Sequence, residues 1–532
     1  MEKKLEKMSI WGWGFETFEI SSSFFNSVTN GLSMLGIHIS SEPIPLPNLN
    51  NIKIPDPRFM LPSPLQSYCT SNFRMRLRHT YGKSTRELLK VLNGIFENVP
   101  DYIAFPKNED QIAAILSYCS EKSIAVVPFG GGSSVTGGIN VASPEKFLGT
   151  IVINLLYLNK LVSLDKINQT ATFQGGIYGP ELEKILSENQ FTYRNYPQSF
   201  EFSTLGGWLA THSGGHFATG RTHIDETVQS LRILTPIGPI ETRQTPPDGA
   251  GPYHNPLFLG SEGIFGIITQ ATIRILRPPK HRLAQKIKFE SFLDGVNALR
   301  EICQSGIQPS NCRLFDGIES IGMGIGHGTE AVMLLGFESA GIDNLEGLMD
   351  YCVKICQKCN GTKVISKGTE ESDKLPDSDF RSNFTSAPYL RNELLRRGVL
   401  VETLETVVSW NKFEKFHEKM INNLYKMVEE LCGKGVVTCR ITHCYPDGLA
   451  PYYTIIGQMD DVKKGVEKWD VIKNIANKTL VEMGASITHH HSVGRDHREG
   501  FKALTGDKIL TILRKIKEVL DPKGIMNPEI LL

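Results

Sequence analysis

Residues 128–138 read PFGGGSSVTGG and directly follow a short apolar run, Ile124–Val127. An apolar run without alternation is typical of a strand that is buried on both faces. Three successive glycines after such a strand allow positive φ angles and a close approach of the main chain to a ligand. Consecutive N–H groups in a turn of this kind bind anions, and nearby serine and threonine hydroxyls add donors. The natural guest of this glycine loop is a diphosphate, although a tight structural turn would explain the same glycines.

Two further loops combine small residues, hydroxyls and glycines with apolar neighbours. One spans residues 197–215 and the other spans residues 260–269. A flat ring system needs this mixture of close backbone approach, oriented hydrogen bonds and apolar walls. No Gly-Lys-Ser/Thr follows the glycine loop, and the loop lacks the GxGxxG dinucleotide pattern. Three such loops in one folding unit indicate a ligand that carries both a diphosphate and a flat ring.

The elements around the glycine loop alternate between strand and helix. Ile103–Phe105 predicts a strand, and Asn108 predicts a helix N-cap with Gln111 as its capping-box partner. Antiparallel pairs are predicted over residues 162–173 and 231–242. Pro180 is expected to open another helix as its first residue.

The pair Pro278-Pro279 follows the last predicted strand of this half, Ala271–Leu276. Beyond it, strands such as Val332–Phe337 alternate with amphipathic helices such as Lys412–Leu431. This order predicts an α+β protein in which a second, cap-like unit with an antiparallel sheet follows the first.

The chain divides into four predicted segments. Residues 1–95 form an extension that wraps the core, 96–279 the ligand-binding domain, 280–485 the cap or substrate domain, and 486–532 a segment that returns to the first domain. Basic residues gather in the extension at Arg74, Arg76, Arg78 and His79. They form either a solvated basic face or an arm that reaches an anion or the active site.

Composition excludes several classes of protein. With 532 residues the chain is far longer than one domain of roughly 100–200 residues. A net charge of zero gives no global field that would recruit nucleic acid. No apolar run reaches the roughly 18 residues that a membrane helix needs, and the charged start, Met1–Lys7, lacks the apolar region of a signal peptide. We expect an intracellular protein without a transmembrane segment and without a nucleic-acid partner.

Residues 488–494 read THHHSVG. Three adjacent histidines cannot all face one way on a helix or a strand, and zinc usually takes spaced ligands, so no metal site is predicted. A solvated histidine run is one explanation of this pattern. Its internal position and its apolar neighbours favour a functional site instead.

The order and spacing of the three loops resemble the FAD-binding domain of the vanillyl-alcohol oxidase superfamily, also called the PCMH-type fold. The resemblance implies that the glycine loop holds the FAD diphosphate and that the other two loops flank the ribityl chain and the isoalloxazine. The implied FAD contacts are Pro128, Phe129, Gly130, Gly131, Gly132, Ser133 and Ser134; Pro197, Gln198, Ser199, Phe200, Glu201, Phe202 and Ser203; Thr211, His212, Ser213 and Gly214; and Glu262, Gly263, Ile264, Phe265, Gly266, Ile267 and Ile268. Some members tether FAD through a histidine just after the glycines. Ser133 and Ser134 stand there in this chain, so we expect non-covalent FAD.

The run His-His-His-x-Val-Gly resembles the alkyldihydroxyacetonephosphate synthase (alkylglycerone-phosphate synthase) family, whereas related flavin D-2-hydroxyacid dehydrogenases carry Glu-His-Gly-Ile-Gly there. The resemblance extends to the N-terminal Trp-Gly-Trp-Gly at residues 11–14 and to residues 521–527. It implies roles for several residues: catalytic Tyr452, His489, His490 and His491, an arginine important for activity, Arg313, and substrate-binding Arg391 and Thr403. Because Tyr453 is adjacent to Tyr452, the register of the catalytic tyrosine stays open by one residue.

The resemblance implies an enzyme that replaces the acyl chain of acyl-dihydroxyacetone phosphate with a fatty alcohol, through an adduct at the flavin N5, to give an ether-lipid precursor. Such substrates imply an apolar tunnel for two chains and shallow contact with a membrane. A homodimer, and a cytoplasmic or a peroxisomal location, are left open. Two alternatives remain: an FAD-linked oxidase or dehydrogenase of a 2-hydroxy acid or alcohol, and a flavoprotein without enzymatic activity.

Overall fold

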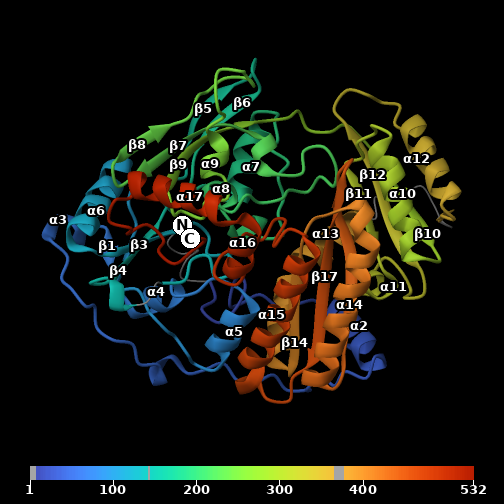
Figure 1. Cartoon of the computed structure of the whole chain (residues 1–532), viewed down its shortest axis with the longest axis horizontal. Helices are drawn as coiled ribbons and strands as arrows, with labels where there is room; N and C mark the ends of the chain where they lie inside the picture. The colour runs from blue at the N-terminus through green and yellow to red at the C-terminus, as the bar shows by residue number, and fades with distance from the viewer. Residues whose placement is uncertain (1–7, 142–143, 365–376) are drawn as a thin grey trace.

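The computed structural model describes residues 8–141, 144–364 and 377–532 and contains three sheets (Figure 1). The first sheet has the order β1-β2-β4-β3, the second has the order β5-β6-β9-β7-β8, and the third has eight strands. Helices and antiparallel sheets are mixed along the chain, which confirms the predicted α+β class. Among the described residues, no helix combines the length and the apolar character required to cross a bilayer.

The first sheet presents the glycine loop. Strands β2 (Tyr102–Ala104), β4 (Thr150–Asn154) and β3 (Ala125–Phe129) are parallel, and β1 (Cys69–Thr70) pairs antiparallel with β2. Helix α6 (Glu109–Lys122) connects β2 to β3. The Asn108 side chain accepts a hydrogen bond from the Gln111 N–H at 3.0 Å, which confirms the predicted N-cap. Gln111 does not complete the predicted capping box, because its side chain accepts from the N–H of Lys107, one residue before the cap, at 2.7 Å.

The second sheet is antiparallel throughout and presents the other two loops. Its strands are β5 (Leu161–Asp165), β6 (Thr170–Gln174), β9 (Ile267–Arg274), β7 (Val228–Thr235) and β8 (Gly238–Glu241). The β5–β6 and β7–β8 pairs confirm the two predicted hairpins. Strand β9 starts at Ile267, four residues before the predicted start, because the third loop runs straight into it. Helix α7 (Gly179–Glu188) has Pro180 as its second residue, which still lies in the first turn, where proline is tolerated.

The third sheet forms the cap. Its strands are β10 (His281–Phe289), β11 (Asn311–Phe315), β12 (Ala331–Ser339), β13 (Thr362–Lys363), β14 (Val399–Glu405), β15 (Val408–Ser409), β16 (Gly435–Cys444) and β17 (Gly448–Gln458). Helices α10 (Phe292–Gln304), α12 (Glu346–Lys358), α14 (Trp410–Cys432) and α15 (Gly465–Met483) pack on it. Helix α13 (Asp377–Arg396) lies beside β14, and α11 (Gly317–Gly322) packs against β12 and β16.

Both ends of the described chain lie against the half that carries the glycine loop. After α16 (Arg498–Thr505) and α17 (Asp507–Leu520), Met526 forms a parallel bridge with Val126 of β3 (Figure 1). Asn527 donates side-chain hydrogen bonds to the carbonyls of Gly138 and Glu262.

The N-terminal extension contributes α2 (Ser22–Met34), α3 (Ser63–Gln66), α4 (Phe73–Arg78) and α5 (Thr85–Leu92). Much of the chain between them has no regular structure, apart from a 3₁₀ turn at Leu49–Asn51. Figure 1 shows this segment running beneath both halves of the molecule.

Candidate active site

The glycine loop is packed so tightly that side chains are excluded from it. A Cβ on Gly131 would lie 1.6 Å from the carbonyl oxygen of Phe202, and one on Gly130 would lie 2.3 Å from Thr204 Oγ1. Gly132 has a φ of +75°, in the left-handed region that favours glycine. The first two predicted loops are therefore pressed together, and only glycine allows this.

The third loop joins the other two. A Cβ on Gly263 would meet the Pro128 ring at 2.8 Å, and the Glu262 N–H donates to the carbonyl of Ala210, just before Thr211. The hydroxyl of Ser213, one of the expected FAD contacts, is buried and has no partner among the described residues. These loops fit FAD, because they combine main-chain approach to a diphosphate with a buried hydroxyl that still needs a partner.

Glu262, one of the expected FAD contacts, also binds the main chain of the histidine segment. Its carboxylate accepts hydrogen bonds from the N–H groups of Val493 and Gly494 at 2.9–3.0 Å. A Cβ on Gly494 would lie 2.0 Å from the Thr136 carbonyl oxygen, and the hydroxyls of Thr136 and Ser492 are 3.1 Å apart. The end of the histidine segment is thus fixed directly onto the glycine loop.

The three histidines lie in a loop between α15 and α16, not on a helix or a strand. The N–H groups of His489, His490 and His491 all donate to the carboxylate of Glu405, at the end of β14. Burial alone would raise the pKa of Glu405, but the neighbouring imidazoles and the Thr488 hydroxyl lower it below its usual value. One carboxylate gathers three successive N–H groups, so the chain turns around it. The expectation that adjacent histidines face different ways holds for a helix or a strand and does not apply to this loop.

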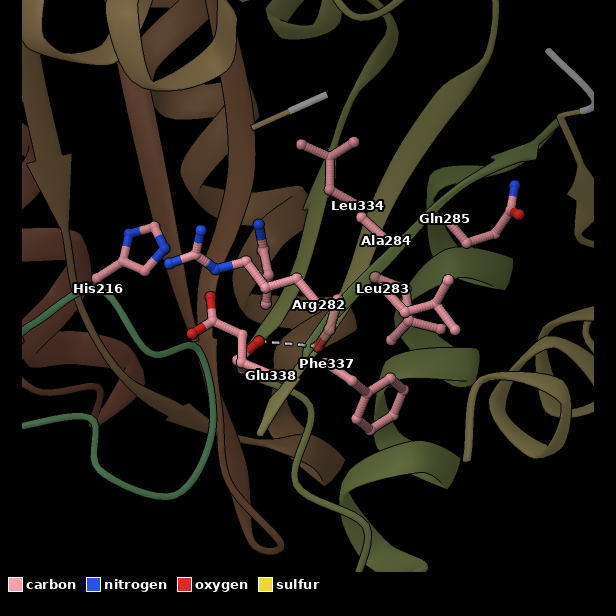
Figure 2. A pocket seen from close by; sticks show the side chains of 12 residues that line it. His216, Arg282, Leu283, Ala284, Gln285, Leu334, Phe337 and Glu338 are labelled. Carbon is pink, nitrogen blue, oxygen red and sulfur yellow. Dashed lines mark hydrogen bonds between the residues drawn. The ribbon is translucent and has the colours of Figure 1, made fainter. Parts of the chain in front are cut away.

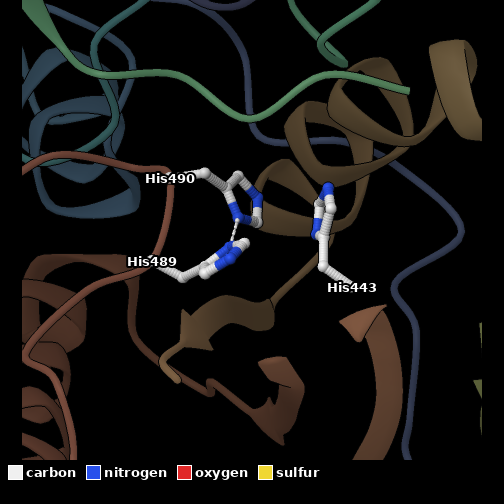
Figure 3. A group of neighbouring side chains, drawn as sticks. All are labelled: His443, His489 and His490. Carbon is white, nitrogen blue, oxygen red and sulfur yellow. Dashed lines mark hydrogen bonds between the residues drawn. The ribbon is translucent and has the colours of Figure 1, made fainter. Parts of the chain in front are cut away.

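His489 and His490 converge with His443 at the end of β16, as Figure 3 shows. The Nδ1 atoms of His489 and His490 are 3.0 Å apart, and the Tyr445 hydroxyl is 2.7 Å from His489 Nε2. One nitrogen from each of the three histidines lies within 4.8 Å of the others. A transition-metal ion can be held at such a spacing, whereas the sequence predicted no metal site. The two hydrogen bonds engage His489 and His490 without an ion.

Burial keeps these imidazoles neutral. It lowers the pKa of His490 and brings that of His491 to about 3, with Glu405 opposing the shift in both cases. It also lowers the pKa of His443 and His489 well below the usual value. Each neutral imidazole has a free lone pair that can accept a proton, and the lowered pKa makes it a weaker base than an exposed histidine.

Tyr452 lies on the histidine side of the third sheet. Its ring stacks on His490 with centroids 6.1 Å apart, and the guanidinium carbon of Arg440 is 3.8 Å from its centroid. Tyr453 points to the opposite face, where its hydroxyl is 3.0 Å from His417 Nδ1. Of these two tyrosines, alternation along β17 therefore brings only Tyr452 to the loop that carries His489, His490 and His491.

Arg313 reaches the same region from β11. It is 6% exposed, and its Nη2 donates to the carbonyl of His216 at 2.9 Å. Its positive charge contributes to the lowered pKa of both His443 and His490. Arg440 on β16, which the sequence did not single out, forms a buried ion pair with Glu319.

The two predicted substrate-binding residues border Tyr452 and the N-terminal extension. Thr403 on β14 is hydrogen-bonded to Tyr452 through their side chains. Arg391 on α13 donates from Nη2 to the carbonyl of Lys83 at 2.8 Å, and its Nε has no partner among the described residues. The structure thus brings Tyr452, Thr403, Arg313 and the histidines together, with Arg391 at one side.

The residues that sequence reasoning missed are His443, Tyr445, Arg440, Glu405 and His223. They come from elements far apart in the chain, so no local motif marks them. His223 is an example: its Nε2 is 3.0 Å from the carbonyl oxygen of His489. The one available signal was the concentration of polar and aromatic side chains at the end of β16, before Pro446.

A small cavity lies between β10, β12 and His216 (Figure 2). Its volume of about 30 Å³ gives room for about two water molecules. It is too small for an alkyl chain, so this cavity is not the apolar tunnel that the resemblance implied.

Comparison with known protein families identifies two matching segments. Residues 100–243 match a family of FAD binding domains, and residues 278–530 match the C-terminal domain of FAD linked oxidases. The alkyldihydroxyacetonephosphate synthase of Dictyostelium discoideum is 29% identical over 471 residues, covering 85% of this chain and 76% of that protein. The synthase of Caenorhabditis elegans is also 29% identical, covering 85% of this chain and 79% of that protein.

The fold is shared with a solved structure of an alkyldihydroxyacetonephosphate synthase. The TM-score is 0.81 at 24% identity, over 98% of this chain and 97% of the other. FAD is thus the cofactor of this chain. The chain therefore carries an FAD binding domain followed by the C-terminal domain of FAD linked oxidases, and it is similar in sequence and fold to alkyldihydroxyacetonephosphate synthases.

Proposed function

We propose that this chain is an FAD-dependent enzyme that exchanges the acyl chain of acyl-dihydroxyacetone phosphate for a fatty alcohol. The observation that carries the proposal is the contact of Tyr452 with His490 and His491, at a histidine cluster fixed to the glycine loop. Three curated relatives with 28–29% identity carry the corresponding name, alkyldihydroxyacetonephosphate synthase.

Each side chain has a task in this reaction. The neutral imidazole of His490 accepts a proton from the carbon next to the ketone. Burial raises the pKa of Tyr452, so its hydroxyl stays protonated and donates a hydrogen bond to the leaving carboxylate. Arg391 has a free Nε and binds the substrate phosphate. Arg313 lies close enough to His443 and His490 to lower their pKa, and it holds the cluster in its basic form.

FAD, when bound by the three loops, supplies an electrophilic ring beside which the substrate carbon reacts. The protein residues orient the substrate and move protons around that carbon. The Glu405 carboxylate and the Glu262 carboxylate hold the two ends of the histidine loop in place. A site fixed at both ends keeps its bases aligned, which is the condition for efficient proton transfer.

The decisive experiment is anaerobic incubation of the FAD-loaded protein with acyl-dihydroxyacetone phosphate and labelled fatty alcohol. Label in an ether product is expected. Permanent bleaching of the flavin by lactate or glycolate, without ether formation, would instead identify a hydroxy-acid oxidase or dehydrogenase. Replacing His490 by Ala should abolish turnover and leave the visible flavin spectrum in place. Full activity in that variant would contradict the role of His490 and favour a flavoprotein that does not use this cluster.

The proposal includes shallow contact with an anionic membrane through α17. An apolar groove of about 670 Å³ lies between α17, α9 (Asn255–Phe258) and β8. Ile512 and Val519 line it and are 53% and 65% exposed, with Lys515 beside them. Exposed apolar side chains next to cations on one helix face are typical of helices that lie in a membrane interface.

A further inference from the structure

Three cations of the N-terminal extension and α13, the buried Arg78 and the half-buried Lys83 and Arg391, have no acidic partner among the described residues. Arg78, the last residue of α4, is 6% exposed. Its Nη2 donates to the thioether of Met8 at 2.8 Å, and its Nε and Nη1 have no partner. A thioether is a weak acceptor, so this guanidinium is left almost entirely unsatisfied.

Lys83 lies next to it. Its ammonium donates to the carbonyl of Ser9 at 3.4 Å, one residue from the Met8 contact of Arg78. Its own carbonyl accepts from Arg391, whose Nε is unpartnered. Burial, followed by the charge of Arg78, lowers the pKa of Lys83 to about 7. The three side chains thus converge on one small region.

The neighbouring carboxylates are already engaged. Glu87 accepts hydrogen bonds from the N–H groups of Gly82 and Ser84 at the start of α5. Glu402 is bound by Trp469 and Lys473. Among the described residues, no carboxylate forms an ion pair with Arg78, Lys83 or Arg391. An unpaired buried charge is costly, and proteins resolve it with a counter-charge.

This cation group lies against the glycine loop. The Lys83 N–H donates to the carbonyl of Ser134 at 2.6 Å. The ring of His79, next to Arg78, is 4.4 Å from the ring of Phe129. The missing counter-charge is therefore expected beside the segment that binds the FAD diphosphate.

The Trp-Gly-Trp-Gly segment closes this region. Met8 and Phe15 form an antiparallel bridge, and the glycines between them lie against α13. A Cβ on Gly14 would lie 2.0 Å from the Tyr389 hydroxyl, and one on Gly12 would lie 2.5 Å from Asn392 Nδ2. Glycine at both positions lets the segment pack against α13, while Met8 contacts Arg78 and Ser9 contacts Lys83.

We infer that Arg78 and Lys83, together with Arg391, bind a phosphate group through the N-terminal extension. The group is either the diphosphate of FAD or the phosphomonoester of the substrate. The second source rests on the proposed function, whereas the first rests only on FAD as the cofactor. Of the two explanations offered for the basic cluster, a solvated face and an arm that reaches an anion, the burial of Arg78 favours the arm.

The test uses the full chain with Arg78→Met and Lys83→Met, and Lys90→Met as the matched control. Lys90 lies in the last turn of α5 and pairs with Glu97 at 2.5 Å, outside the cation group. FAD affinity is measured by titrating the apoprotein, and phosphate-ester affinity by calorimetry of the FAD-loaded protein with glycerol 3-phosphate. Losing a charge-assisted hydrogen bond is expected to weaken binding at least about tenfold in one of the two assays.

Each outcome has one meaning. Weaker FAD binding identifies the cofactor diphosphate, and weaker glycerol 3-phosphate binding alone identifies the substrate phosphate. Changes of less than about twofold in both assays overturn the inference.

The apoprotein of Arg78→Met should melt no lower than the native apoprotein, because an unpaired buried charge has been removed. A lower melting temperature that Arg78→Lys restores without any change in affinity would show a structural cation and also overturn it. If the native protein binds no glycerol 3-phosphate, the proposed function is weakened while the FAD assay still decides this inference.

Discussion

The ring of Tyr452 lies nearly parallel to the imidazole of His490, with the two planes 20° apart and the centroids separated by 6.1 Å. If the Tyr452 hydroxyl donates a hydrogen bond to the leaving carboxylate, Tyr452→Phe removes that donor and keeps the ring in place. We expect kcat to fall by about 10²–10³-fold with little change in FAD affinity. Steady-state kinetics and flavin titration measure the two effects.

Tyr453→Phe is the matched control for that variant. It removes a hydroxyl from the adjacent residue on the opposite face of β17, where the partner is His417. We expect near-native turnover and a loss of about 1 kcal/mol of stability, because one buried hydrogen bond is lost. Equal loss of turnover in the two variants would count against the assignment of Tyr452.

The two tyrosines also show where sequence reasoning ends. The glycine loop, the two hairpins and the Asn108 cap could be predicted because each depends on neighbours in sequence. The choice between Tyr452 and Tyr453 could not, because it depends on which face of β17 meets the histidine loop. That meeting is fixed by Glu405, a residue of another strand whose carboxylate gathers the histidine N–H groups.

Arg440 lies against the ring of Tyr452, and it forms a buried ion pair with Glu319. Arg440→Met should destabilise the protein by about 3–5 kcal/mol, because it leaves the Glu319 carboxylate buried and unpaired. Adding Glu319→Gln should recover most of that loss. Chemical denaturation of the single and double variants measures the coupling.

The exposed pair of Lys419 and Glu482, 2.8 Å apart, provides the control for this cycle. Lys419→Met should cost less than about 1 kcal/mol, as is usual for exposed ion pairs. If Arg440→Met cost no more than Lys419→Met, the pair beneath Tyr452 would not be the buried support that its position indicates.

Glu262 predicts a pH dependence of stability. Burial raises its pKa from 4.5 to about 7, and the N–H groups of Gly494 and Val493 partly oppose this shift. Between these two values the folded protein keeps a proton that the unfolded chain has released. The contribution of Glu262 to the free energy of unfolding therefore falls as pH rises through this window.

Glu262→Gln stays uncharged and still offers a carbonyl oxygen to the same N–H groups. Its stability relative to the native protein should increase by up to about 3 kcal/mol between pH 4.5 and pH 7 and change little above that range. Denaturation of both proteins in saturating FAD across this range is the measurement. A difference that stays constant with pH would mean that Glu262 is ionised in the folded protein throughout.

Helix α17 predicts binding to anionic lipid vesicles. Lys508, Ile512, Lys515 and Val519 follow one another on a single exposed face of this helix at spacings of three and four residues. The apolar pair would enter the interface while the lysines meet lipid headgroups, so binding should weaken as salt is raised. Replacing Ile512 and Val519 together by Ser should reduce vesicle co-sedimentation at least about fivefold, given roughly 1.5–3 kcal/mol for each buried aliphatic side chain.

The control for this double variant is Ile167→Ser, because Ile167 is 93% exposed in the β5–β6 turn, away from α17. Equal binding of all three proteins, or binding that is independent of salt, would exclude α17 as the membrane-contacting surface.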